Sequence, residues 1–299
     1  MVIAVVPYMA LKLLWLSGST GGVSDPAAVA ELQGARMVVG NLVTIVLELL
    51  AIGLAVALTR PWGRRVPAWI VLGLAGGATG LLAPILLGLP LGSAIQFLVR
   101  SDVRTSGMDN MDPWVFAAVY GSFGLLAVAI MVLAWNYALA RWERVLAVRP
   151  HRPDAWTIAI GAVGMLPLGT AMAWWGLMGP GGAGPQAMDA LAQRTVLVIT
   201  AVLCCAGFVA PILGAAIDRP RALWLATWVG CATAALQGPA QVLLAQGGSP
   251  TPAMIVLAVL ATPASCVYGL RVLRLSAGVT GQARVASSTA APAAPASRR

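Results

Sequence analysis

The stretch that decides the fold is Met37–Thr59, MVVGNLVTIVLELLAIGLAVALT, which stands between Arg36 and Arg60. It contains a single charged side chain, Glu48, and is otherwise almost entirely apolar. The hydrocarbon core of a bilayer is about 30 Å thick, and a helix needs around 20 apolar residues to cross it. The stretch therefore predicts a transmembrane helix.

The same pattern recurs along the whole chain. Its 299 residues are 59% apolar and only 10% charged, with a mean hydropathy of +0.85. A soluble domain carries roughly 25% charged residues, so lipid must be the solvent for most of this chain. The sequence predicts an all-α, polytopic transmembrane helical bundle of about eight spans, at residues 1–16, 37–59, 66–87, 113–134, 155–177, 195–217, 222–245 and 252–270.

The third predicted span lies in an uncharged run, residues 66–99, that is too long for one span and too short for two. Pro84, Gly88 and Pro90 interrupt this run. Broken backbone at membrane depth is tolerated only where protein or a water-filled cavity covers it. We therefore expect the helix to end near Leu87, and residues 91–99 to form a half-helix that lies along the outer face or dips into it.

Basic residues are divided unequally between alternate loops. With the N-terminus inside, the inside loops and the tail carry fourteen arginines, and the outside loops carry four. Cytoplasmic loops are enriched in Lys and Arg, so we predict a multi-pass protein of the bacterial plasma membrane with both termini cytoplasmic. This topology explains the net charge of +9, which therefore does not indicate nucleic-acid binding. The predicted partner is the lipid bilayer.

Landmarks recur in the same order in the two halves of the chain. Arg60-Pro61 closes the second span and Arg219-Pro220 closes the sixth, while Tyr137 and Tyr268 stand near the ends of the fourth and eighth. Four spans is an even number, so this order favours two parallel four-helix repeats. We predict a first half at residues 1–144, a second half at 145–274, and a disordered cytoplasmic tail rich in Ala, Pro, Ser and Arg at 275–299.

Few polar side chains lie inside the predicted spans. Glu48 stands near the middle of its span, and Asn41 and Thr44 share its helical face. A charge at the bilayer centre costs about 2.5–3.5 kcal/mol and normally faces the bundle interior. Lys12 on the first span could reach it, and the seventh span carries a second polar stripe. The candidate intramembrane polar site is Glu48, Lys12, Asn41, Thr44, Thr233, Gln237 and Gln241.

Three interpretations of Glu48 remain open at this point. It could be a paired or protonated carboxyl that joins neighbouring helices, a group that couples a proton or substrate, or a side chain that reaches toward the lipid surface. Lys12 could likewise extend to the outer headgroups instead of pairing with the acid. A functional site predicts a water-accessible cavity at Glu48, whereas a purely structural role predicts a fully packed one.

The sequence predicts no catalytic residue, no cofactor and no metal site. The single histidine, His151, stands in a basic loop and cannot by itself form a histidine-rich metal site. Cys204, Cys205, Cys231 and Cys266 contain no Cys-x-x-Cys pair and lie within predicted spans, so they indicate no disulfide framework. With one lysine, which lies in a span, there is no phosphate-binding loop. These observations lean against an enzyme.

The stretch LLWLSGSTGG, Leu13–Gly22, resembles the Trp- and Gly-rich segment that follows the first span in multi-span membrane proteins of high-GC bacteria. The resemblance covers this segment and the general layout of spans, and it implies neither an activity nor a functional residue. The leading hypothesis is a permease or transporter-like protein with its site near Glu48. The alternative is a membrane scaffold or accessory subunit without transport, and the third is a membrane-embedded enzyme.

Overall fold

The computed structural model describes residues 2–23, 29–30, 32–100, 111–214, 216–245 and 249–289. These residues form a helical bundle, which confirms the predicted fold class, and contain no strand beyond an isolated bridge between Val23 and Met111. The elements are α1 (Val2–Leu16), α3 (Ala35–Thr59), the 3-10 helix η1 (Pro61–Arg65), α4 (Ala68–Arg100), α5 (Pro113–Leu146), α6 (Ala155–Met178), α7 (Leu191–Ile212), α8 (Pro220–Leu243) and α9 (Pro252–Thr289).

All eight predicted spans are helices, but only six described helices are long and apolar enough to cross a membrane. The 15 residues of α1 extend for about 22 Å, less than the hydrocarbon core. The helix α8 has 24 residues, but polar side chains such as Gln237 and Gln241 lower its apolar character. It packs against α4, α7 and α9, so much of its surface meets protein instead of lipid. The predicted count of eight apolar spans was therefore wrong for α1 and α8.

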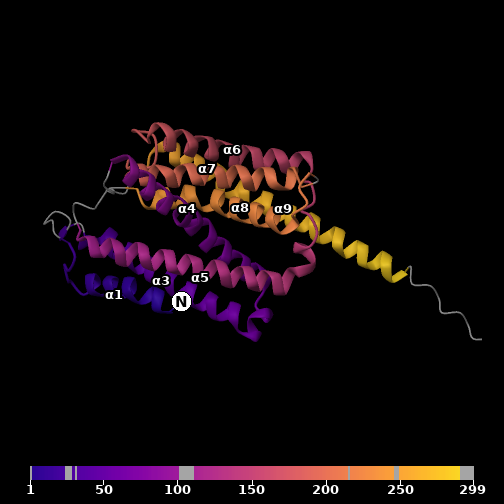
Figure 1. Ribbon diagram of the computed structural model, residues 1–299, viewed down its shortest axis with the longest axis horizontal. Coiled ribbons are helices and arrows are strands. Elements are labelled where there is room, and N and C mark those ends of the chain that lie inside the picture. The colour runs from indigo at the N-terminus through magenta and orange to yellow at the C-terminus, as the bar shows by residue number, and fades with distance from the viewer. Residues whose placement is uncertain are drawn as a thin grey trace, which may run out of the picture.

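The helices form two groups that lie side by side (Figure 1). One group contains α6, α7, α8 and α9, which pack as a ring around an apolar core that includes Met165, Leu168, Met172 and Leu197. The other contains α1, α3 and α5, whose cores are two smaller clusters. The two groups differ in tightness, since the apolar parts of α6, α7 and α9 are 39%, 56% and 28% buried, and those of α3 and α5 are 22% and 17% buried.

The helix α4 connects the two groups and corrects the predicted break after Leu87. It is a single helix of 33 residues that includes Pro84 and Pro90. At about 50 Å it is longer than the hydrocarbon core, so it must tilt, and Figure 1 shows it crossing obliquely between the groups. Although α4 precedes α5 in the chain, most of its contacts are with α7 and α8.

Close helix contacts explain how α4 remains helical through its prolines. Gly88 and Gly92 bring its backbone against Val196 and Ala192 of α7, and a Cβ on Gly88 would lie 2.7 Å from the Cα of Val196. Small residues allow this approach, and neighbouring helices stabilise the disturbed backbone. The pattern of prolines alone does not reveal that a second helix covers this segment.

The far end of the chain also differs from its prediction. The helix α9 continues to Thr289 and projects beyond the bundle (Figure 1), so helix occupies residues 275–289 of the predicted disordered tail. The remaining predicted tail, residues 290–299, lies outside the described residues.

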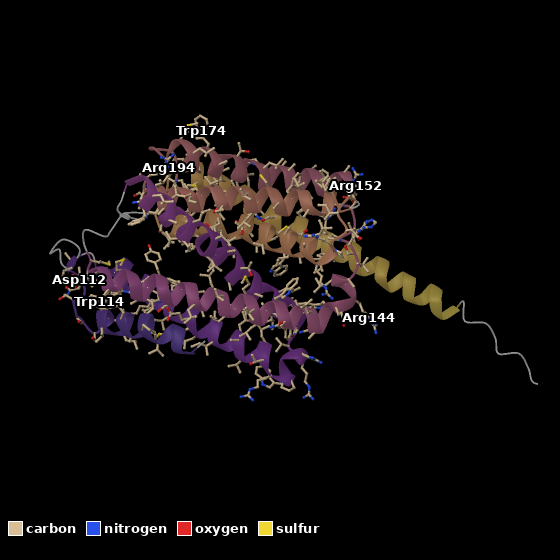
Figure 2. All side chains as sticks on the ribbon, in the orientation of Figure 1. Asp112, Trp114, Arg144, Arg152, Trp174 and Arg194 are labelled. Atoms are coloured by element: carbon tan, nitrogen blue, oxygen red, sulfur yellow. The ribbon has the colours of Figure 1, made fainter. Side chains whose placement is uncertain are left out.

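Charged residues mark the two ends of the bundle. Arg144 and Arg152 lie at one end, whereas Arg194 and Asp112 lie at the opposite end (Figure 2). Trp114 and Trp174 also lie at that second end, where amphipathic indole rings favour the interface between lipid and water.

Candidate functional site

A charged pair lies buried between α1 and α3. The Nζ atom of Lys12 lies 2.5 Å from Oε1 of Glu48, to which it donates a hydrogen bond. Lys12 is 0% exposed and Glu48 is 4% exposed. They are the only charged side chains that are buried among the described residues. Two residues 36 positions apart are thus brought into direct contact within the smaller helix group.

Aromatic rings extend this pair toward α5. Tyr8 precedes Lys12 by one helical turn, which places both on the same face of α1. The centre of the Tyr8 ring lies 3.6 Å from Nζ of Lys12, a cation–π contact. The same ring lies 4.9 Å from that of Phe123 on α5, at an angle of 58°. The site therefore joins α1, α3 and α5.

One oxygen of the site has no hydrogen-bond partner. Oε1 of Glu48 accepts from Lys12, but Oε2 is buried and accepts no hydrogen bond in the structure. A buried polar atom without a partner costs free energy, and a charged one costs more. An ion pair that only joins helices gains most when its remaining oxygen is also bonded. The buried Oε2 atom of Glu48, which has no hydrogen-bond partner, is therefore the feature of this pair that a purely structural role does not explain.

The predicted face of α3 is the one that turns inward. Asn41 and Glu48 are both buried, while Val43 and Val46 on other faces are more than half exposed. Thr44 is partly buried, and its hydroxyl donates to backbone oxygens of its own helix, Gly40 at 2.9 Å and Asn41 at 3.0 Å. It therefore bonds within α3 and not to the acid.

The polar stripe of α8 belongs to a different interface. Gln237 is 5% exposed and its Nε2 atom donates to the backbone oxygen of Gly80 on α4 at 2.8 Å. Thr233 is fully buried, its hydroxyl has no hydrogen-bond partner, and Gln241 is partly buried. The structure thus brings Lys12 to Glu48, and it places Thr233, Gln237 and Gln241 where α8 packs against its own neighbours.

Sequence reasoning missed two side chains beside the charged pair, Tyr8 and Phe123, and one buried amide at another helix contact, Gln96. Tyr8 was detectable as an aromatic residue one turn before Lys12, but Phe123 carries no local signal because its contact depends on how α5 packs. Gln96 is 2% exposed on α4, and its Oε1 atom accepts from the backbone N–H of Ala192 in the first turn of α7 at 3.0 Å. This amide lay in the uncharged run 66–99 and could have been noted as a buried polar group.

The chemistry available at the pair is limited to one ammonium, one carboxylate and aromatic rings. No group of three or more His, Cys, Asp or Glu that could hold a metal occurs in the described part of the chain. A lone carboxylate already bonded to an ammonium is a poor metal ligand, since cations prefer several oxygen donors and would be repelled by Lys12.

Comparisons with known proteins identify no relative of this chain. No protein-family model, curated protein or solved structure matches the chain.

Proposed function

We propose that the protein is a proton-coupled, permease-like membrane protein in which the Lys12–Glu48 pair takes up and releases the proton. The observation that carries this proposal is the bare Oε2 atom of Glu48, buried beside an ion pair that joins two helices. Ionisable residues inside membrane bundles commonly mark proton or substrate pathways. Six apolar helices of sufficient length make the chain an integral membrane protein, which such a pathway requires.

The coupling follows from the charges. A proton that bonds to Oε2 neutralises the carboxylate and removes most of its attraction for Lys12. The ammonium would then be buried beside a neutral carboxyl and the Tyr8 ring, without a counter-charge, which disfavours the closed packing of α1 on α3. Because α3 is loosely packed, its movement breaks few contacts. Loss of the proton restores the pair and closes the helices.

The test is proton-driven uptake into liposomes that contain the purified protein. A fixed panel of radiolabelled amino acids, organic acids, nucleobases and simple aromatics is offered with an imposed proton gradient. We expect wild type to accumulate at least one compound and Glu48→Gln to lose this accumulation, because Gln keeps the shape but cannot titrate. Glu143→Gln is the matched control, since Glu143 is exposed near the end of α5. Equal accumulation by Glu48→Gln and wild type would rule out the coupling role.

A second candidate is a scaffold or accessory subunit in which the pair is purely structural. The observation that favours it is the closed packing of the pair, since Lys12 and Glu48 are 0% and 4% exposed. In that case Glu48→Gln would behave as wild type in every uptake assay, while Glu48→Leu would lower the melting temperature by leaving Lys12 unpaired. The two candidates therefore give opposite results for the Gln variant.

We also propose that the arginine-rich end of the bundle faces the cytoplasm of a bacterial cell, with both termini on that side. The distribution of fourteen arginines against four supports this orientation, and Arg144 and Arg152 lie at the same end of the bundle (Figure 2). In a variant without native cysteines, Gly182→Cys should react with an impermeant thiol reagent added to intact cells, and Ala147→Cys should not. Both positions are exposed. The reverse pattern would invert the proposed orientation.

We further propose that the two halves are parallel repeats. The order of contacts supports this, since α6, α7, α8 and α9 form a closed ring and α1, α3, α4 and α5 contact one another in the same cyclic order. Tyr137 and Tyr268 also support it, because each donates to a backbone oxygen at or beyond the last turns of the second helix of its half. An experimental structure in which the halves fail to superpose about an axis near the membrane normal would reject the repeat.

A further inference from the structure

A hollow lies between α4 and α5, in the region where α4 departs from the smaller helix group. Its volume is about 190 Å³. We call it the α4–α5 hollow, and among the residues that line it are Leu86, Pro90, Ser93, Tyr120, Phe123 and Gly124.

The packing of α4 and one glycine explain why this space exists. Gly88 and Gly92 pull α4 onto α7, which separates that part of the helix from α5. On the α5 side, a Cβ built on Gly124 would meet no atom within 4 Å. A larger residue at this position would therefore project into open space without a clash. The hollow therefore exists because glycines stand at these positions of α4 and α5.

The lining defines the chemistry of a ligand. No charged side chain lines the hollow, and its walls are largely aliphatic, with the rings of Tyr120 and Phe123 on the α5 side. A charged ligand would lose its hydration there without compensation, so the ligand is neutral. The hydroxyl-bearing residues Ser93 and Tyr120 provide polar atoms at the wall. An apolar cavity of about 150 Å³ in another protein binds benzene, so this volume suits a molecule of one or two small rings.

The hollow is linked to the charged pair through Phe123. This ring lines the hollow and also contacts the ring of Tyr8 at a centroid distance of 4.9 Å. Tyr8 in turn lies against the ammonium of Lys12. A ligand that fills the hollow restrains Phe123 and thereby Tyr8. It therefore favours the arrangement in which Lys12 is held against Glu48.

We propose that the α4–α5 hollow is the substrate site and takes a small, neutral aromatic molecule that carries one hydrogen-bonding group. This inference rests on the proposed function, because it identifies the substrate class of the proton-coupled permease. Binding in the hollow and the charge state of Glu48 influence each other through Phe123 and Tyr8. Since the ionised pair holds Tyr8 in place, the ligand binds more tightly when Glu48 is ionised.

The experiment measures equilibrium binding of radiolabelled indole to the full-length protein in lipid nanodiscs, with empty nanodiscs subtracted. We expect saturable binding of one indole per protein. Gly124→Leu should weaken it by about tenfold or more, because the added side chain occupies the hollow. Gly121→Leu is the matched control: it makes the same change one turn earlier on α5, also in open space, but Gly121 does not line the hollow. Its binding should equal that of wild type.

Three results would overturn the site. The first is the absence of saturable indole binding, and the second is an equal loss of binding in Gly124→Leu and Gly121→Leu. The third concerns bound lipid. If phospholipid copurifies with wild type but not with Gly124→Leu, and indole does not displace it, the hollow holds an acyl chain and the proposal is wrong.

A pH series separates this proposal from the proposed function. We expect indole affinity to fall with acidification in wild type and to be independent of pH in Glu48→Gln. Saturable binding that is lost in Gly124→Leu but does not depend on pH in wild type would support the site and refute its coupling to Glu48. Proton-driven uptake abolished by Glu48→Gln, without any indole binding, would support the permease and refute this substrate site.

Discussion

The two helix groups of this protein use glycine in opposite ways. In the group of α6 to α9, glycines lie at helix contacts, and a Cβ on Gly207 would lie only 2.6 Å from the Cα of Gly230. On α3 and α5, the helical glycines face open space, with no atom within 4 Å of a built Cβ, at Gly40, Gly53, Gly121 and Gly124. Close backbone contact makes the first group a tight unit, whereas α3 and α5 have fewer close contacts with other helices.

The two helix groups also differ in whether they contain buried charged side chains. The buried ion pair Lys12–Glu48 lies in the loosely packed group, whereas no charged side chain is buried among the described residues of α6 to α9. The proposed proton coupling requires surroundings that can rearrange, since a rigid core would hold one charge state. The comparison suggests a rigid unit formed by α6 to α9 with α4 attached, against which α1, α3 and α5 move.

The largest change in stability should come from breaking the Lys12–Glu48 ion pair in the group of α1, α3 and α5. Lys12→Met leaves the Glu48 carboxylate buried without its partner, and we expect a loss of about 3–5 kcal/mol in the free energy of unfolding. The double variant Lys12→Met, Glu48→Leu should recover most of this loss, because it removes both charges. Unfolding in detergent followed by circular dichroism measures both. A double variant less stable than Lys12→Met would show that the pair is not the source of the loss.

The next effect tests the tight group. Gly207→Ala in α7 should cost about 1–3 kcal/mol, because the added methyl would overlap the backbone of α8. Gly53→Ala on α3 is the matched control, since its methyl meets no neighbour and alanine favours a helix over glycine by about 1 kcal/mol. We expect the two variants to shift the melting temperature in opposite directions. Equal shifts would remove the distinction between the groups.

A smaller effect concerns a feature that both groups share. The hydroxyl of Tyr137 donates to the backbone oxygen of Gly63 at 2.9 Å, and that of Tyr268 donates to the backbone oxygen of Phe208 at 2.7 Å. Tyr268→Phe should lose about 1 kcal/mol, the usual net contribution of one hydrogen bond. Tyr137→Phe should lose more, because the Tyr137 hydroxyl also accepts a hydrogen bond from the guanidinium of Arg141. The same denaturation measurement checks this. A Tyr137→Phe variant as stable as wild type would show that these hydroxyl hydrogen bonds do not contribute to stability.

The smallest effect is at a helix start and depends on pH. The carboxylate of Asp154 accepts from the backbone N–H of Thr157 at 2.7 Å. Hydrogen bonding to Thr157, first to its side chain and second to its backbone N–H, lowers the pKa of Asp154 below its ordinary value of 3.8. A lowered pKa in the folded state means that the cap contributes stability above the ordinary pKa and loses it as pH falls through the lowered one. Asp112, which precedes α5, makes no such cap bond.

We therefore expect the melting temperature of wild type to fall slightly as the pH drops below about 4. This fall should be smaller in Asp154→Asn, because Asn keeps a capping oxygen but cannot titrate. Asp112→Asn should follow wild type. A melting curve whose pH dependence is identical in wild type and Asp154→Asn would exclude the cap as its source.

The positions of the helices and the inward face of α3 could be predicted from the sequence because they depend on local composition. A long apolar segment must be helical in lipid, where every backbone group needs an internal partner. Glu48 stood out because an acid in an apolar segment is costly wherever it faces lipid. The same local rule overestimated the apolar character of α8, whose polar residues are covered by other helices. It also predicted a break in α4 at the prolines, where the helix in fact continues.

What the tertiary structure alone decided is which helix faces meet. The association of α4 with α7 and α8, the bare oxygen of Glu48 and the hollow beside Gly124 all depend on contacts between segments distant in the chain. The sequence contains the small residues that permit close contact, but it does not tell which of them find a partner: Gly76 and Gly80 pack against α8, while Gly73 and Gly77 on the same helix face open space. In lipid, apolar faces look alike to the solvent, so shape complementarity between helices selects the partners, and that selection is non-local.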